Sequence, residues 1–123
     1  MEQLISLLFL ARDLAHREHL RTDSFAQHMA LGEFYDEIID NADAIAEAYM
    51  GSYGVLKDFS IQESQSSTPI IKELEKHVSW IDSNRYKACD KDDTPIQNLI
   101  DAAVETYLTA IFKLKRLKWL NHG

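Results

Sequence analysis

Two histidines and two carboxylates are the residues of this chain whose types and spacing could do chemistry. They are His16, His28, Asp43 and Glu47. Imidazole and carboxylate donors together suit a borderline cation such as ferrous iron. Asp43 and Glu47 are four residues apart, so a helix carries both carboxylates on one face. The pattern predicts a metal site built from these four side chains, and no catalytic residue is assigned beyond them.

The spacing along the chain decides how such a site could be assembled. His28 and Asp43 are fifteen residues apart, which is about 22 Å along an α-helix. One chain therefore cannot bring all four donors to one ion. A second copy in antiparallel orientation can, because its Asp43 and Glu47 then reach His16 and His28 of the first chain. We expect a homo-oligomer, a dimer at least.

Three further side chains are candidate accessory ligands. His19 follows His16 by three residues, and Glu33 and Asp36 belong to an acidic stripe that continues through Asp40. A stripe of carboxylates at helical spacing is also typical of a solvated helix face. For His19, a surface histidine with no ligand role is the favoured interpretation. Both interpretations of these residues stay open at this point.

Four amphipathic helices must position these residues. Few residues break helices, since the chain has only four glycines and two prolines. Apolar residues recur at intervals of three and four. The segments that carry this pattern are about 2–21, 24–50, 68–89 and a last one that starts at 94. We expect one all-α domain over residues 1–123, arranged as a four-helix bundle.

Sequence signals also indicate where the helices begin. Ser24 followed by Gln27 fits a capping box, in which a side-chain oxygen accepts from an early backbone N–H group. Thr94, Pro95 and Gln97 form a similar start signal for the fourth helix. These signals place a short turn before each of the two helices.

The second and third helices are joined by a long connection, residues 51–67. Its glycines, Gly51 and Gly54, indicate the end of the second helix. A connection of this length should cross the bundle or carry a turn of its own. The apolar residues that could anchor it are Val55, Leu56, Phe59 and Ile61.

Charge and cysteine content exclude some function classes. The formal net charge is −7, so phosphate backbones repel the chain and nucleic-acid binding is disfavoured. The single cysteine, Cys89, and the absence of a secretory signal indicate the cytoplasm. The apolar run 4–11 is too short to span a bilayer, so we expect no membrane association.

The segment from Ala15 to Gly54 resembles the Dps family of mini-ferritins. In that family a second histidine follows the first after twelve residues, an aspartate follows after fifteen more, and a glutamate after a further four. Here those positions are His16, His28, Asp43 and Glu47, and every interval matches. The glutamate stands in an Ala-Glu pair, as it does in the family. The later layout is similar too, with an acidic turn before the fourth helix.

The resemblance implies a ferritin-like fold and a ferroxidase activity. Ferrous iron would bind between two subunits, be oxidised by peroxide or oxygen, and be stored as a ferric mineral inside a dodecameric shell. His16 and His28 would supply imidazole ligands. Asp43 and Glu47 would supply carboxylate ligands from the partner.

Two positions depart from the family pattern. Arg17 stands where the family has Trp, and Gly32 stands where an acidic residue bridges two irons. Glu33 is adjacent to that position but about 100° around the helix. The first helical segment starts almost at residue 1, so we also expect a short chain without the Lys-rich N-terminal tail through which family members compact DNA.

These departures favour an alternative function. The bundle could be a catalytically degenerate member that serves as a protein-interaction or regulatory module and binds another protein. A third and less favoured interpretation is nucleic-acid binding by the basic end of the fourth helix, which carries Lys113, Lys115, Arg116 and Lys118.

Overall fold

Four α-helices make up the computed structural model, which describes residues 1–64 and 68–117. No strand occurs within those ranges. The helices are α1 (Glu2–Arg21), α2 (Phe25–Tyr53), α3 (Ile70–Ala88) and α4 (Thr94–Arg116). The predicted all-α class and the four helical segments are therefore confirmed. Among the described residues, none of the helices has the length and apolar character needed to cross a bilayer.

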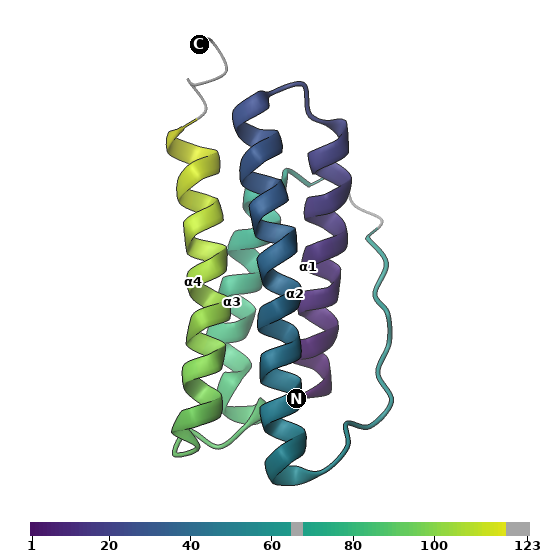
Figure 1. Ribbon diagram of the computed structural model, residues 1–123, viewed down its shortest axis with the longest axis vertical. Helices are drawn as coiled ribbons and strands as arrows, with labels where there is room; N and C mark the ends of the chain where they lie inside the picture. The colour runs from purple at the N-terminus through teal and green to yellow at the C-terminus, as the bar shows by residue number, and fades with distance from the viewer. Residues whose placement is uncertain (65–67, 118–123) are drawn as a thin grey trace.

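The helices pack as a bundle in which every neighbouring pair is antiparallel. Helices α1 and α4 run in one direction and α2 and α3 in the other (Figure 1). The packed pairs are α1 with α2, α2 with α4, α4 with α3 and α3 with α1, so α1 and α4 lie diagonally. The α2–α3 connection accordingly begins at one end of the bundle and leads back toward the other along α1 (Figure 1). The topology is thus two antiparallel hairpins joined by one crossover.

The core is built from the predicted apolar stripes. Leu8, Leu31, Ile38, Leu74 and Ile100 have no exposed surface, and each comes from a stripe that the periodicity marks. Burying an aliphatic side chain of this size stabilises the fold by about 2 kcal/mol. The stripes of all four helices therefore meet along one central axis.

A buried polar pair joins α3 and α4 inside this core. The Nδ1 atom of His77 on α3 is 2.9 Å from the hydroxyl oxygen of Tyr107 on α4. Both side chains are buried, and Tyr107 also packs edge-to-face against Phe34 of α2. Burial lowers the pKa of His77 to about 4 and raises the pKa of Tyr107 well above its usual value. The neutral forms of both groups are therefore the ones that the core accommodates.

The two predicted helix starts have different outcomes. At α2 the prediction is confirmed, because the Ser24 side chain accepts a hydrogen bond of 3.1 Å from the backbone N–H of Gln27. At α4 it is wrong by one residue. Asp93 is the N-cap, Thr94 is the first helical residue, and no side chain caps the helix.

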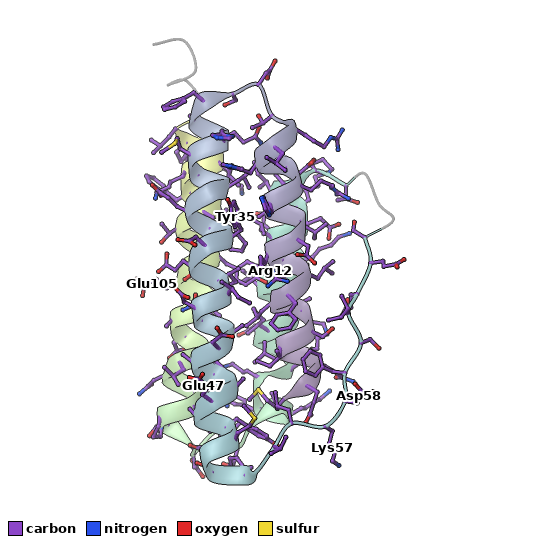
Figure 2. The ribbon with its side chains drawn as sticks, turned by 45° about the vertical axis from the view of Figure 1, so that its right-hand side comes forward. Arg12, Tyr35, Glu47, Lys57, Asp58 and Glu105 are labelled. Carbon is purple, nitrogen blue, oxygen red and sulfur yellow. The ribbon has the colours of Figure 1, made fainter. Side chains whose placement is uncertain are left out.

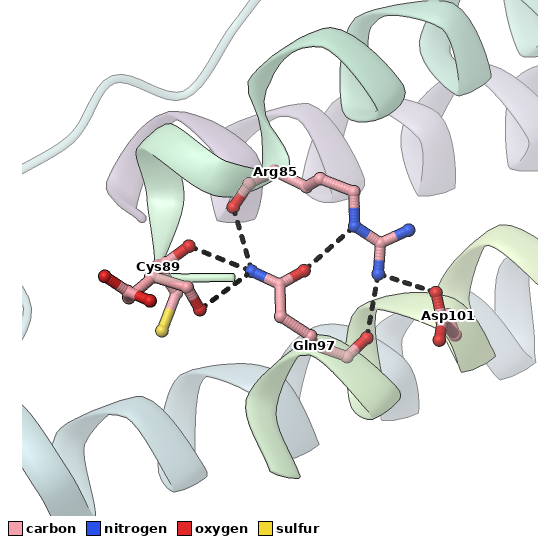
Figure 3. A network of polar contacts seen from close by, with 5 residues as sticks. Arg85, Cys89, Gln97 and Asp101 are labelled. Atoms are coloured by element: carbon pink, nitrogen blue, oxygen red, sulfur yellow. Dashed lines mark hydrogen bonds and ion pairs between the residues drawn. The ribbon is translucent and has the colours of Figure 1, made fainter. Parts of the chain in front are cut away.

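Gln97 points away from the start of α4 and toward the end of α3. Its amide nitrogen donates to the carbonyl of Cys89 at 2.9 Å and to that of Arg85 at 3.2 Å (Figure 3). Its amide oxygen accepts from the Arg85 guanidinium at 2.9 Å, and the same guanidinium bonds Asp101 at 2.6 Å (Figure 3). Gln97 thus gives the carbonyl of Cys89, just past the end of α3, a partner from another helix. It also adds a second bond to the Arg85 carbonyl, which already accepts from the backbone N–H of Cys89. The predicted capping box failed because the side chain found these tertiary partners.

The connection after α2 is held against α1 by hydrogen bonds and a ring contact. Gly54 ends α2 with φ +93°, a conformation that favours glycine, whereas Gly51 lies inside the helix. Ser6 of α1 donates to the Ser60 carbonyl at 2.5 Å, and Phe9 packs edge-to-face on Phe59. Leu56 is also half-buried, as expected. Val55 and Ile61 are exposed, so the prediction that they anchor the connection is wrong.

Candidate metal site

The four predicted ligands all lie on the α1–α2 hairpin, but at two separate levels. His16 is near the end of α1 and exposed, and His28 is in the first turns of α2 and half-buried. Asp43 and Glu47 are exposed farther along α2, and Glu47 lies well below Tyr35 in the view that labels both (Figure 2). A single chain therefore holds the imidazoles apart from the carboxylates.

Among the residues that the structure describes, donor side chains of one chain do not converge. In residues 1–64 and 68–117, no three His, Cys, Asp or Glu side chains are placed so that they could hold one metal ion. Three of the histidines nevertheless gather with one aromatic ring on the α1–α2 hairpin. That cluster, which we name the hairpin cluster, contains His16, His19, His28 and Tyr35.

His19 and His28 form a reciprocal pair across the hairpin. The Nδ1 of His19 is 2.6 Å from the carbonyl oxygen of His28, and the Nδ1 of His28 is 2.7 Å from the carbonyl oxygen of His19. The two rings stack with centroids 3.6 Å apart. A carbonyl oxygen can only accept, so each Nδ1 must carry the hydrogen. In the neutral rings, Nε2 is then the nitrogen with a free lone pair.

This arrangement has a direct chemical meaning. Histidines that bind metals donate the hydrogen of the other ring nitrogen to a carbonyl or carboxylate, which fixes the tautomer and the ring orientation. His19 and His28 both satisfy that condition. His16 is placed differently: its ring stacks on Tyr35 with centroids 4.3 Å apart.

Gly32 makes room for His19. A Cβ atom at position 32 would lie 3.0 Å from Cε1 and 3.2 Å from Nδ1 of His19. Real Cβ atoms rarely approach other atoms so closely. The space that a side chain at position 32 would need is therefore filled by the imidazole of His19 from α1.

The other candidates lie at the surface. The Glu33 carboxylate forms an ion pair with Lys113 of α4, and Asp36 is exposed. Arg17 is also largely exposed, with its guanidinium 3.7 Å from Glu18. Of the three accessory candidates, only His19 belongs to the hairpin cluster.

Sequence reasoning missed the packing of His19 and Tyr35. The interpretation of His19 as a plain surface histidine is wrong, because its ring is half-buried and hydrogen-bonded. Its spacing of three from His16 hinted at a shared face. Nothing in the spacing indicated that it would bond His28, because that contact depends on how α1 and α2 pack.

Fold and cluster together define a four-helix bundle that carries histidines on one hairpin. Residues 19–114 match the model of a family described as a family of unknown function (DUF5856). That match covers most of the chain, so the protein belongs to this family. No curated protein and no solved structure matches. The matched span includes His19, Gly32, His28, Asp43 and Glu47, and it begins after His16.

Proposed function

We propose that this protein is a ferritin-like, Dps-like bundle that binds ferrous iron between two subunits. One subunit contributes His16 and His28, and a second copy contributes Asp43 and Glu47. The topology supports this proposal, because antiparallel hairpins joined by one long crossover are the arrangement of ferritin-like bundles. The twelve-subunit shell remains an expectation drawn from the resemblance.

The observation that carries the proposal is the hydrogen bond of His28. Its Nδ1–H donates to the carbonyl of His19 at 2.7 Å, so Nε2 keeps its lone pair for a cation. Asp43 and Glu47 are exposed farther along α2. In an antiparallel pair of copies, these carboxylates of one copy would lie beside the imidazoles of the other. A two-fold axis would then create two equivalent sites.

The side chains have separate tasks in this site. The two carboxylates would offset the charge of a divalent cation, and the neutral imidazoles would set its position. The acidic stripe along α2 would raise the local concentration of cations near the site. Ferrous iron is the substrate, and it supplies the electrons that reduce peroxide or oxygen.

Iron oxidation by variants tests this function. Ferrous iron is added to the metal-free protein, and ferric absorbance is followed together with the size of the assembly. His28→Ala and Glu47→Gln should each lower the rate at least ten-fold. Glu37→Gln, an exposed change on the same helix, is the matched control and should keep the rate. Unchanged oxidation in both site variants would contradict the site.

One observation favours a second candidate, the protein-interaction module. Three apolar side chains stay exposed near the hairpin end: Leu20 at 71%, Phe25 at 71% and Met29 at 46%. Phe25 and Met29 line a groove of about 510 Å³ between α2 and the end of α4. If this function is right, the wild type should bind a protein partner that the Phe25→Ser variant does not bind. The wild type should also bind no stoichiometric iron. Tight iron binding by Phe25→Ser with no partner for the wild type would count against it.

A further inference from the structure

A second set of donors lies within one chain, on α1 alone. His16 and His19 are one helical turn apart, with ring centroids separated by 6.2 Å and ring planes inclined by 55°. Metal–nitrogen bonds of about 2 Å place two imidazoles on one ion with centroids roughly 5–6 Å apart. The two rings are therefore already close to the separation that a shared cation requires.

The ring nitrogens of both residues are suited to this role. The Nδ1–H of His19 is engaged by the His28 carbonyl at 2.6 Å, so its Nε2 is the nitrogen left to bind. His16 is exposed, and its ring nitrogens bond no other side chain or backbone group in the described part of the chain. A shared cation would require the His16 ring to turn one of its nitrogens toward the His19 Nε2, and the exposed position of His16 leaves that ring room to turn.

His28 cannot share this cation with His19. Their rings are nearly parallel, inclined by 19° at a centroid separation of 3.6 Å. Each nitrogen lone pair lies in the plane of its own ring, so nearly parallel planes do not meet at bonding distance. His28 therefore acts on His19 through its carbonyl and leaves its own Nε2 for a different ion.

We propose that His16 and His19 form a two-imidazole site for one borderline divalent cation, such as Zn²⁺, Co²⁺ or Ni²⁺. Imidazole donors suit these ions, and water completes the coordination. The inference extends the proposed iron site because the two share His16, yet it requires no second subunit. It also gives Gly32 a role, since any side chain there would press on the His19 ring.

Two measurements on the full chain test this site. First, ¹⁵N NMR of the histidine rings in the metal-free protein, at pH about 8.5 where imidazoles are neutral, should show His19 with hydrogen on Nδ1. Zn²⁺ should then shift the Nε2 resonance of His19 and one ring-nitrogen resonance of His16. Second, Co²⁺ binding should weaken at least ten-fold in His16→Ala and in His19→Ala. Leu20→Ala, an exposed neutral change beside them, should bind as the wild type.

The outcomes separate this site from the iron site. Unchanged Co²⁺ affinity in His16→Ala or in His19→Ala would overturn the inference. Because His16 is exposed, its variant should keep the fold. If Glu47→Gln lowers iron oxidation while both histidine variants keep their Co²⁺ affinity, the proposed function stands and this inference fails. If the histidine variants lose Co²⁺ while Glu47→Gln oxidises iron normally, the inference stands and the intersubunit site fails.

Discussion

The imidazole of His19 lies against the backbone of Gly32, with Cε1 only 3.0 Å from the place where a Cβ atom would stand. This contact joins the end of α1 to the end of the second turn of α2. The imidazole of His19 fills the space that a side chain at position 32 would occupy. The same contact holds His19 within reach of the His28 carbonyl, so Gly32 and His19 should be energetically coupled.

Gly32→Ala tests that coupling. Alanine in a helix interior is normally better than glycine by about 1 kcal/mol, but here the new methyl group presses on the His19 ring. We expect the substitution to give no gain in the wild type and to stabilise the His19→Ala background by about 1 kcal/mol. Urea unfolding of the four proteins measures both values. Equal gains in the two backgrounds would show that the contact carries no energy.

The buried histidine of the core predicts a pH dependence. Burial holds the pKa of His77 at about 4 in the folded state, against 6.5 for an exposed histidine. As the pH falls, the unfolded chain therefore binds a proton at His77 before the folded chain does. The folded state is fully stable in this respect above pH 6.5, and its unfolding free energy decreases as the pH falls toward 4. The full loss is about 3 kcal/mol.

Unfolding free energies between pH 7 and pH 4 check this prediction. The variant His77→Gln keeps a polar side chain that does not titrate, and its stability should fall less over that range. A slope identical to that of the wild type would mean that the acid sensitivity comes from carboxylates instead.

The end of α3 depends on a side chain from α4. Gln97→Ala removes the donor that the Cys89 and Arg85 carbonyls share, and it also removes an acceptor from Arg85. The loss of these hydrogen bonds, above all the one to the Cys89 carbonyl, should cost about 2 kcal/mol of unfolding free energy. Asp101→Asn is the control. Its ion pair with Arg85 is short, but the Asp101 side chain is 61% exposed, so this change should cost less than about 1 kcal/mol.

Much of the helical framework could be predicted because it follows from local rules. The spacing of Leu4, Leu8 and Ala11 marks the buried side of α1 without any knowledge of its neighbours. Ser24 caps α2 through a hydrogen bond to a residue three positions away. Contacts of such short range are visible in a sequence.

The contacts that sequence reasoning missed join residues from different elements. Gln97 carries a capping-box signature, yet its side chain bonds the end of α3, because Arg85 and Cys89 come within reach only after the helices pack. Phe59 packs on α1 while Val55 does not, and both are apolar residues of one connection. Side-chain choices of this kind depend on tertiary distances.

In the candidate site, too, local spacing could be predicted and tertiary contacts could not. The spacing of His28, Asp43 and Glu47 already predicted two levels on one helix, and the structure places them so. The reciprocal bonds of His19 and His28 could not be predicted, since they depend on the relative rotation of α1 and α2. The identity of the metal and the pairing of subunits remain our proposals.

The central claim is that iron binds between two copies, and mixing inactive chains tests it most directly. One chain carries His16→Ala and His28→Ala, and the other carries Asp43→Asn and Glu47→Gln, so that each homodimer lacks half of the ligands at both sites. After the chains are unfolded together and refolded, a mixed dimer contains one site with all four ligands. We predict that iron oxidation returns to about one quarter of the wild-type level after random pairing. No recovery in a mixture that forms mixed dimers would contradict an intersubunit site.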